Sequence, residues 1–259
     1  MRFVRYHGTA HAEWGLLQAD GGRVQVLEGD PLAGYTATRR YVDLLDLKVL
    51  APATPTKIVA VGLNYAAHAA ESSKPLPEEP LLFLKPPSSI NANNGPIHVP
   101  FPHHRTDFEA ELGVVIGRKC RHLQPSTWRD AVLGYTCAND VTDRTLQRKD
   151  GQYTRGKGFD TFCPLGPVLA TEIDPDDLEI ECRVNGSLRQ HSRTSDLIFD
   201  VCTVLCFVSS IMTLEPWDVV LTGTPSGVGP MSGGDMVEVK IEGVGTLVNP
   251  VCSLQGGGA

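Results

Sequence analysis

The segment Asp107-Phe108-Glu109-Ala110-Glu111-Leu112 leads directly into Gly113-Val114-Val115-Ile116-Gly117. A short apolar run of this kind predicts a β-strand. Alternate side chains of a strand share a face, so Glu109 and Glu111 point to one place, while Phe108, Ala110 and Leu112 point the other way. Burying an unpaired carboxylate costs several kcal/mol, so we expect a positive group between the two glutamates. A solvated acidic face is the alternative interpretation of this pair taken alone.

A third carboxylate, Asp140, follows an apolar run over residues 131–138 that predicts a second strand. A side chain at the end of a strand can project from the sheet. Three carboxylates provide the oxygen ligands that Mg²⁺, Mn²⁺ or Ca²⁺ prefer, and the lack of nearby cysteine or histidine disfavours zinc. We therefore expect a site for a divalent cation. A turn or capping aspartate is the alternative for Asp140, because Asn139 and Asp143 lie beside it.

Residues 58–61 form an apolar run, and residues 66–71 are rich in helix formers, with Asn64 as the expected N-cap. On such a helix His68 and Glu71 are three residues apart and face the same side. A carboxylate paired with an imidazole fixes its tautomer, which suits a general base. The alternative is an ordinary surface pair.

Two further segments carry candidate binding groups. Lys157 lies between Gly156 and Gly158, in a predicted loop where a cation could meet an anionic substrate or enolate; a solvated surface lysine is the alternative. Residues 221–229 predict a strand followed by a loop rich in glycine and threonine. Its hydroxyls and amides could bind a carboxylate, and an ordinary turn cluster is the alternative.

The rest of the chain carries mainly strand signals, with a few helices and no repeats. Asp20-Gly21-Gly22 and Asn185-Gly186 predict hairpins, and residues 236–241 alternate like a strand. The many prolines of residues 72–102 predict a long surface excursion, and residues 197–212 predict a buried helix. Residues 51–55, with Pro52 and Pro55, break regular structure, so we expect a small β-rich N-terminal domain over 1–52 and a catalytic domain over 53–259.

The composition limits the class of protein. A chain of 259 residues with a formal charge of -7 and a pI near 5.6 is unsuited to nucleic acid or an anionic membrane, so we expect a small-molecule partner. No basic and then apolar leader opens the sequence, which predicts a cytoplasmic location. Seven scattered cysteines without a Cys-x-x-Cys pair predict reduced thiols buried as small hydrophobes.

Taken together, the motifs resemble the fumarylacetoacetate hydrolase family over residues 57–251. The ordered motifs that carry this resemblance are VGLNYAAHAAE (61–71), FLKP (83–86), DFEAELGVVIG (107–117), NDVTDRTLQ (139–147), KGFDTFCPLGP (157–167), RVNG (183–186) and LTGTPSGVG (221–229). The resemblance implies a mixed β-sandwich roll, a homodimer, and a lid formed by the segment that bears the histidine.

The resemblance also implies three groups of site residues. These are the metal ligands Glu109, Glu111 and Asp140, the catalytic residues His68, Glu71 and Lys157, and the substrate contacts Lys85, Arg144, Gln147 and Thr224. The implied cofactor is Mg²⁺, or else Mn²⁺ or Ca²⁺.

The implied function is action on a small 2-oxo acid through an enolate that the metal stabilises. Hydrolytic C–C cleavage of an acylpyruvate-like substrate and decarboxylation of the oxaloacetate type both fit. Isomerisation or tautomerisation of unsaturated 2-hydroxy dicarboxylates in aromatic catabolism uses the same enolate, so it stays open. A non-catalytic module that keeps the metal for structure is the alternative from another class.

Overall fold

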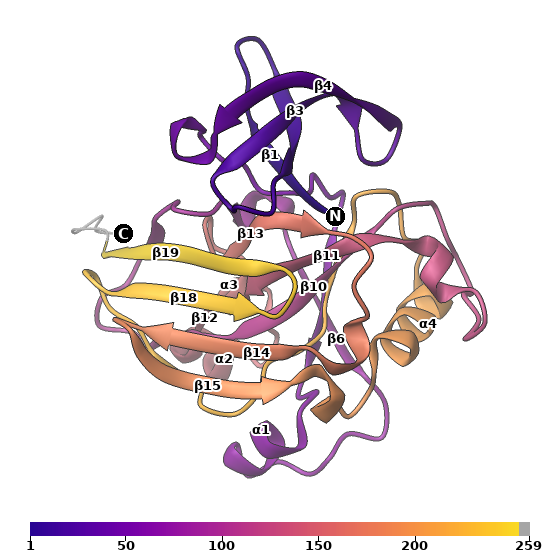
Figure 1. The fold of residues 1–259 in the computed structure, drawn as a ribbon. Coiled ribbons are helices and arrows are strands. Elements are labelled where there is room, and N and C mark those ends of the chain that lie inside the picture. Colours follow the sequence, from indigo (N-terminus) through magenta and orange to yellow (C-terminus); the bar gives the residue numbers. More distant parts are fainter. Residues whose placement is uncertain (254–259) are drawn as a thin grey trace.

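Two packed sheets dominate the fold (Figure 1). The computed structural model describes residues 1–253, so residues 254–259 of the predicted catalytic domain lie outside the described part. Within residues 1–253 the largest sheet has eleven strands, in the order β4 (Gly34–Asp43), β3 (Arg23–Asp30), β2 (Ala12–Leu17), β1 (Arg2–His7), β13 (Cys163–Ala170), β11 (Val132–Asn139), β10 (Ala110–Ile116), β16 (Val219–Leu221), β5 (Ile58–Gly62) and β6 (Leu81–Lys85), with β7 (Ile90–Asn91) beside β13.

The smaller sheets complete the β architecture. In the same described range, a five-stranded sheet contains β15 (Ser187–Arg193), β14 (Glu179–Val184), β18 (Met236–Ile241), β19 (Gly245–Ser253) and β8 (Ile97–Val99), and a three-stranded sheet contains β12 (Thr142–Asp143), β9 (Thr106–Phe108) and β17 (Gly229–Pro230). The predicted mainly β fold is therefore confirmed.

Short helices connect the strands. The α-helices are α1 (Ala66–Glu71), α2 (Arg144–Asp150), α3 (Thr154–Lys157) and α4 (Val201–Ile211), and the 3-10 turns are η1 (Leu44–Asp46), η2 (Pro87–Ser89), η3 (Trp128–Ala131), η4 (Pro175–Asp177) and η5 (Thr194–Asp196). Across residues 1–253, none of these helices has the length and apolar character needed to cross a membrane.

Strand β10 lies at the centre of the core, between β11 and β16, and is buried along its whole length. Its side chains alternate between two apolar clusters. Leu112 and Val114 pack in the cluster that includes Ile180 and Val239 of the five-stranded sheet, whereas Val115 packs in the cluster on the opposite face. Each buried aliphatic side chain stabilises the fold by roughly 1.5–3 kcal/mol, so packing on both faces holds β10 in the core.

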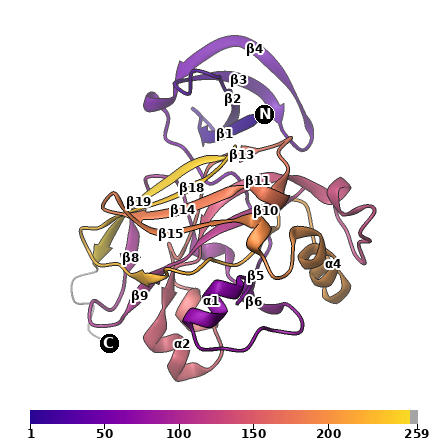
Figure 2. The ribbon, with the colours of Figure 1, turned by 60° about the horizontal axis from the view of Figure 1, so that its bottom comes forward.

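The N-terminal strands β1–β4 form the lobe at the top of Figures 1 and 2. This lobe continues the main sheet, because β1 pairs with β13. The hairpin predicted at Asp20 is present, and Asp20 Oδ1 accepts hydrogen bonds from the backbone N–H groups of Gly22 and Arg23 at 3.0 and 3.1 Å. The predicted domain boundary near residue 52, which implies that residues 1–52 and 53–259 fold independently, stays a prediction.

The hairpin predicted at Asn185-Gly186 joins β14 to β15. Both residues have positive φ, 52° and 75°, as the tightest hairpin turns require.

Asn64 does not cap helix α1, so that prediction was wrong. The helix begins after Tyr65, whose side chain makes no capping bond within residues 1–253. The Asn64 side chain is buried: its Nδ2 donates to the carbonyls of Phe199 and Thr222 at 2.9 and 2.8 Å, and its Oδ1 accepts from Phe199 N–H at 2.8 Å. A buried amide needs several partners, and two distant backbone segments supply them here.

Residues 72–102 are not a structureless excursion, because they contain β6, β7 and β8. The prolines misled the prediction: Pro80 and Pro86 flank β6 and leave its own backbone donors free to pair with β5.

The helix predicted as buried over residues 197–212 is α4, which is buried on only one face, and Ile211 at its end is 51% exposed. The cysteine prediction was partly right: Cys120, Cys137, Cys163 and Cys182 are buried, but Cys202, Cys206 and Cys252 are not.

Asp218 fastens the start of the catalytic segment to the core. It is fully buried before β16 and accepts from Thr56 N–H, Thr56 Oγ1, Lys57 N–H and Glu215 N–H at 2.8–3.1 Å, besides its ion pair with Lys57. Burial alone would raise the pKa of Asp218, but the hydrogen bonds, that from Lys57 first, hold it below its ordinary value.

We predict that Asp218→Asn destabilises the protein by about 3 kcal/mol, because Lys57 and several donors lose a charged partner. A carboxyl with a lowered folded-state pKa stabilises the fold above its unfolded pKa and loses that effect as pH falls. The difference between wild type and variant in urea unfolding should therefore shrink below about pH 4. Asp130→Asn, at an exposed ion pair with Arg118, is the matched control and should change stability little.

Candidate active site

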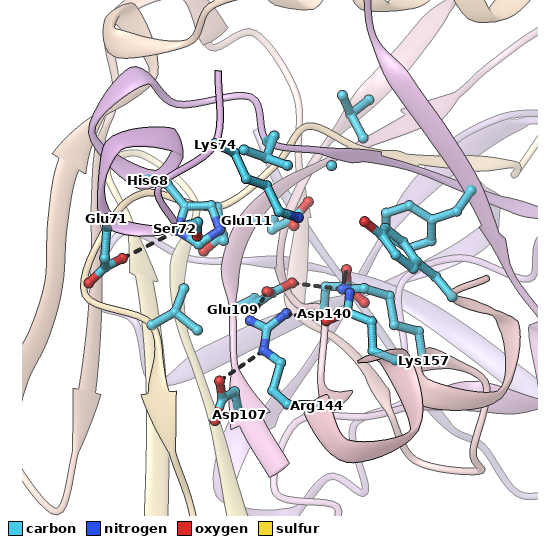
Figure 3. A pocket seen from close by; sticks show the side chains of 18 of the residues that line it. His68, Glu71, Ser72, Lys74, Asp107, Glu109, Glu111, Asp140, Arg144 and Lys157 are labelled. Atoms are coloured by element: carbon cyan, nitrogen blue, oxygen red, sulfur yellow. Dashed lines mark hydrogen bonds and ion pairs between the residues drawn. The ribbon is translucent and has the colours of Figure 1, made fainter. Parts of the chain in front are cut away.

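Three buried carboxylates meet at the start of β10 (Figure 3). Glu109, Glu111 and Asp140 each offer an oxygen atom, and these atoms lie within 4.8 Å of one another. The pairing of β10 with β11 places them together, because Ala110 lies opposite Asn139 and Asp140 directly follows that strand. Glu109 and Glu111 therefore share a site, as strand alternation predicts.

The predicted continuous strand is interrupted at Glu109. Strand β9 ends at Phe108 and pairs with β12 and β17 in another sheet, and β10 begins at Ala110. At the break, the backbone N–H of Glu109 donates to Asn139 Oδ1 at 2.9 Å, and its carbonyl accepts from Asp140 N–H at 2.8 Å. The side chain of Asn139 thus replaces a ladder bond and fixes the turn of the chain between the sheets.

Two buried lysines neutralise part of this acidic group. Lys157 Nζ donates to Glu109 Oε2 and Thr142 Oγ1, both at 2.8 Å, and forms an ion pair with Asp140. Lys85 Nζ donates to Asp140 Oδ1 at 2.5 Å and to the carbonyl of Val141 at 3.3 Å. The expected positive group between the carboxylates is therefore present, although Lys157 ends helix α3 and does not lie in the predicted loop.

An arginine cluster borders the same carboxylates. Arg144, the first residue of α2, forms an ion pair with Glu109, donates from Nε to Asp107 Oδ2 at 2.9 Å, and donates from Nη1 to Gln147 Oε1 at 2.9 Å. Asp107 also accepts from Arg105 Nε at 2.8 Å. The sequence interpretation missed the roles of Asp107 and Arg105. The alternation that pairs Glu109 with Glu111 extends to Asp107 and was the available signal.

The electrostatics differ between the two glutamates. Burial raises the pKa of Glu109, but Arg144 and Lys157 outweigh burial and leave that pKa below its ordinary value. Burial, and then Asp140 and Glu109, raise the pKa of Glu111 well above its ordinary value. The lysines bond to Glu109 and Asp140, whereas among residues 1–253 the Glu111 side chain accepts only one hydrogen bond, from Gly223 N–H at 2.7 Å. Glu111 is thus the carboxylate that most lacks a cation.

The candidate base lies on a separate element. In α1 the Nδ1 of His68 lies 3.3 Å from Glu71 Oε2, and the two Glu71 oxygens accept from Gly227 N–H at 3.2 and 3.1 Å. The loop after β16 thereby holds Glu71 in place.

A cavity of about 550 Å³ joins these groups. Of the predicted site residues, those that line it are His68, Glu71, Glu109, Glu111, Asp140, Arg144, Gln147, Lys157 and Thr224. Among the described residues that line the cavity Lys85 is absent: its side chain is buried and its Nζ is bonded to Asp140, so its contact with substrate stays a prediction. Strand β6 buries Lys85 next to Asp140, and the sequence alone could not predict this contact.

The residues fit a hard divalent cation. The donor set consists of carboxylate oxygens, and its member Glu111 is fully buried without a bonded cationic side chain from the part of the chain that the structure describes. The fold and the site define a mainly β protein in which an acidic triad and a His–Glu pair line one cavity.

Comparison with known proteins assigns the family. Residues 57–252 match the family model "Fumarylacetoacetate (FAA) hydrolase C-terminal", and residues 1–52 match "Rv2993c-like, N-terminal". The chain belongs to the fumarylacetoacetate hydrolase family. The resemblance seen in the sequence motifs is thus confirmed.

Individual relatives cover most of the chain. A protein of Methanocaldococcus jannaschii is 52% identical over 209 residues, which are 81% of this chain and 87% of the relative. The mitochondrial oxaloacetate tautomerase fahd2 of Xenopus laevis is 43% identical over 219 residues, 80% of this chain and 69% of the relative. The crystal structure of 5-carboxymethyl-2-hydroxymuconate delta-isomerase from Mycobacterium smegmatis superposes with a TM-score of 0.90 at 43% identity and covers 98% of this chain and 100% of that one.

We predict that Mg²⁺ or Mn²⁺ raises the thermal midpoint of the wild type. At a metal concentration one hundred times the dissociation constant, the free energy of unfolding should increase by about 2.7 kcal/mol. Glu111→Gln should abolish the shift. Glu181→Gln is the matched control, because Glu179, Glu181 and His191 also form a group that could hold a cation. An unchanged shift in Glu111→Gln, or its loss in Glu181→Gln, would place the cation elsewhere.

Proposed function

We propose that this protein is a divalent-metal-dependent enzyme that hydrolyses a C–C bond of an acylpyruvate-like 2-oxo acid. The observation that carries the proposal is that one cavity is lined both by the acidic triad and by the His68–Glu71 pair of a different element. A cation site alone suits many roles. A cation site facing a positioned base suits bond cleavage by water.

Glu109, Glu111 and Asp140 would hold the cation. When bound there, it would polarise the 2-oxo group and stabilise the negative charge of an enolate. Lys157 would support the same charge through its field, because its bonds already go to Glu109, Asp140 and Thr142.

The cavity favours an anionic substrate. Arg144, Gln147 and Thr224 line it near the acidic triad, and we propose that they bind the substrate. Lys74 also points into it (Figure 3), and Arg105 and Arg148 add further positive charge. Together with a bound divalent cation, they would outweigh the carboxylates that line the same cavity and would orient the carboxylate of a 2-oxo acid.

The base is oriented by its neighbours. An ionised Glu71 only accepts hydrogen bonds, so His68 donates from Nδ1 and keeps a lone pair on Nε2. His68 would take a proton from a water molecule at Nε2, and the resulting hydroxide would attack the carbonyl distal to the 2-oxo group. The C–C bond then breaks: the fragment that gained the hydroxide leaves as a carboxylic acid, and the electron pair stays on the three-carbon fragment as an enolate. The proton that His68 took would return to the enolate carbon and give pyruvate. Decarboxylation of oxaloacetate reaches the same enolate without the attack of water.

A second candidate is keto–enol or double-bond isomerisation. The similarity to an isomerase and to an oxaloacetate tautomerase favours it. In that case His68 would move a proton between atoms of one substrate, and no small product would be released.

We predict Mg²⁺-dependent release of pyruvate from at least one member of a panel of acylpyruvates, fumarylpyruvate and oxaloacetate. His68→Ala should lower the rate by about 10²–10⁴-fold, because a general base is lost. His191→Ala is the matched control: His191 also pairs with a glutamate, Glu179, at 3.0 Å, but it lies on β15 outside the cavity. Product mass and diene absorbance are recorded in the same reactions.

The outcomes separate the candidates. A changed absorbance with unchanged mass would replace hydrolysis by isomerisation. Thermal stabilisation by Mg²⁺ without turnover of any substrate would indicate a non-catalytic module. Equal rates in His68→Ala and wild type would remove the proposed base. The homodimer expected from the family stays a prediction that light scattering can check.

A further inference from the structure

Gln190 is a fully buried amide whose three bonds connect two parts of the candidate site. It lies on β15 of the five-stranded sheet and is 1% exposed. Its Oε1 accepts from the backbone N–H of Ala110 at 3.0 Å. Its Nε2 donates to Thr224 Oγ1 and to the carbonyl of Pro225, both at 2.8 Å. Ala110 separates Glu109 from Glu111, so Gln190 ties the acidic strand to the loop after β16.

The orientation of this amide is fixed by its neighbours. A backbone N–H can only donate and a backbone carbonyl can only accept. Ala110 therefore requires the amide oxygen and Pro225 requires the amide nitrogen, and a flipped amide would oppose donor to donor and acceptor to acceptor. The N–H that remains on Nε2 must point to Thr224 Oγ1.

The fixed amide determines what the Thr224 hydroxyl can do. A hydroxyl that accepts a hydrogen bond still has its own hydrogen to donate. Within the part of the chain that the structure describes, no acceptor receives that hydrogen, and Thr224 lines the cavity beside the acidic triad. The hydrogen is therefore available to an acceptor atom inside the cavity.

We propose that Gln190 is a positioning residue that holds the Thr224 hydroxyl as a hydrogen-bond donor toward a carboxylate or 2-oxo oxygen of the bound substrate. This inference rests on the proposed function, because it assigns the hydrogen-bond donor, the Thr224 hydroxyl, that meets an oxygen atom of the proposed 2-oxo acid. It also gives the five-stranded sheet a part in substrate binding: buried Gln190 would act through Thr224, which lines the cavity.

The test is the affinity of the full chain for oxalate in the presence of Mg²⁺, measured by calorimetry. Oxalate presents two adjacent carboxylates in place of the carboxylate and enolate of a 2-oxo acid. Gln190→Glu has nearly the same shape but only accepts, so it takes the Thr224 hydrogen for itself. We expect it to weaken oxalate binding about 10- to 100-fold, the range for a hydrogen bond to a charged group. Thr224→Val should weaken binding to a similar extent, and Thr224→Ser should restore it.

The double variant Gln190→Glu/Thr224→Val separates positioning from added charge. If Gln190 acts through Thr224, the double variant binds oxalate no more weakly than Thr224→Val. Gln190→Met loses all three bonds but leaves the hydroxyl free to rotate, so it should weaken oxalate binding less than Gln190→Glu even if it lowers the thermal midpoint more. A purely structural role would reverse that order.

Losses that add in the double variant, or oxalate affinity in Gln190→Glu within twofold of wild type, would overturn the proposal. Turnover of the 2-oxo acid panel is measured in parallel. An inactive wild type would contradict the hydrolytic function and leave the comparison of oxalate affinities intact.

Discussion

The pairing of β10 with β11 is the constraint on which the site depends. It places Ala110 opposite Asn139, and thereby puts two glutamates of one strand next to Asp140 at the end of the other. Apolar side chains cover both faces of β10, and the three carboxylates at its start are buried where they line the cavity. Burial of like charges at this spacing is unfavourable unless cations or protons balance them.

The balance comes from elements far apart in the chain. Lys85 arrives on β6, Lys157 on α3 and Arg144 on α2, and each bonds to Glu109 or Asp140. Among residues 1–253, Glu111 is left with a backbone donor, and burial, followed by the neighbouring Asp140 and Glu109, raises its pKa. The same distribution of charge makes the cavity suitable for a cation and, beyond it, for an anionic substrate.

Local rules predicted the elements of this fold well where the signal was local. The hairpin at Asn185-Gly186 and the helix bearing His68 and Glu71 follow from turn chemistry and helix periodicity within a few residues. The rules failed where a distant partner decides the outcome. Asn64 looks like a helix cap, but backbone groups near residues 199 and 222 satisfy its amide instead.

The candidate site divides in the same way. Strand and helix periodicities singled out the pairs Glu109–Glu111 and His68–Glu71, because they place such residues on one face. Asp140 was a candidate from its position after a predicted strand, and the resemblance to the family joined it to the two glutamates. The sequence interpretation missed Asp107 as the acceptor for two arginines and Gln190 as the link to Thr224. No period or spacing reports a contact between residues separated by 30 or more positions, such as that of Ala110 with Gln190.

The amino-acid sequence by itself therefore determined the mainly β class, the family and the residue types that could carry the chemistry. These depend on short-range periodicity and on ordered motifs. Only the tertiary structure decided that buried Lys85 bonds to Asp140, that no described lysine or arginine bonds to Glu111, and that the second sheet reaches the site through a buried amide. The physical reason is that charge balance and hydrogen-bond polarity are properties of the packed interior, where groups from distant segments must satisfy one another.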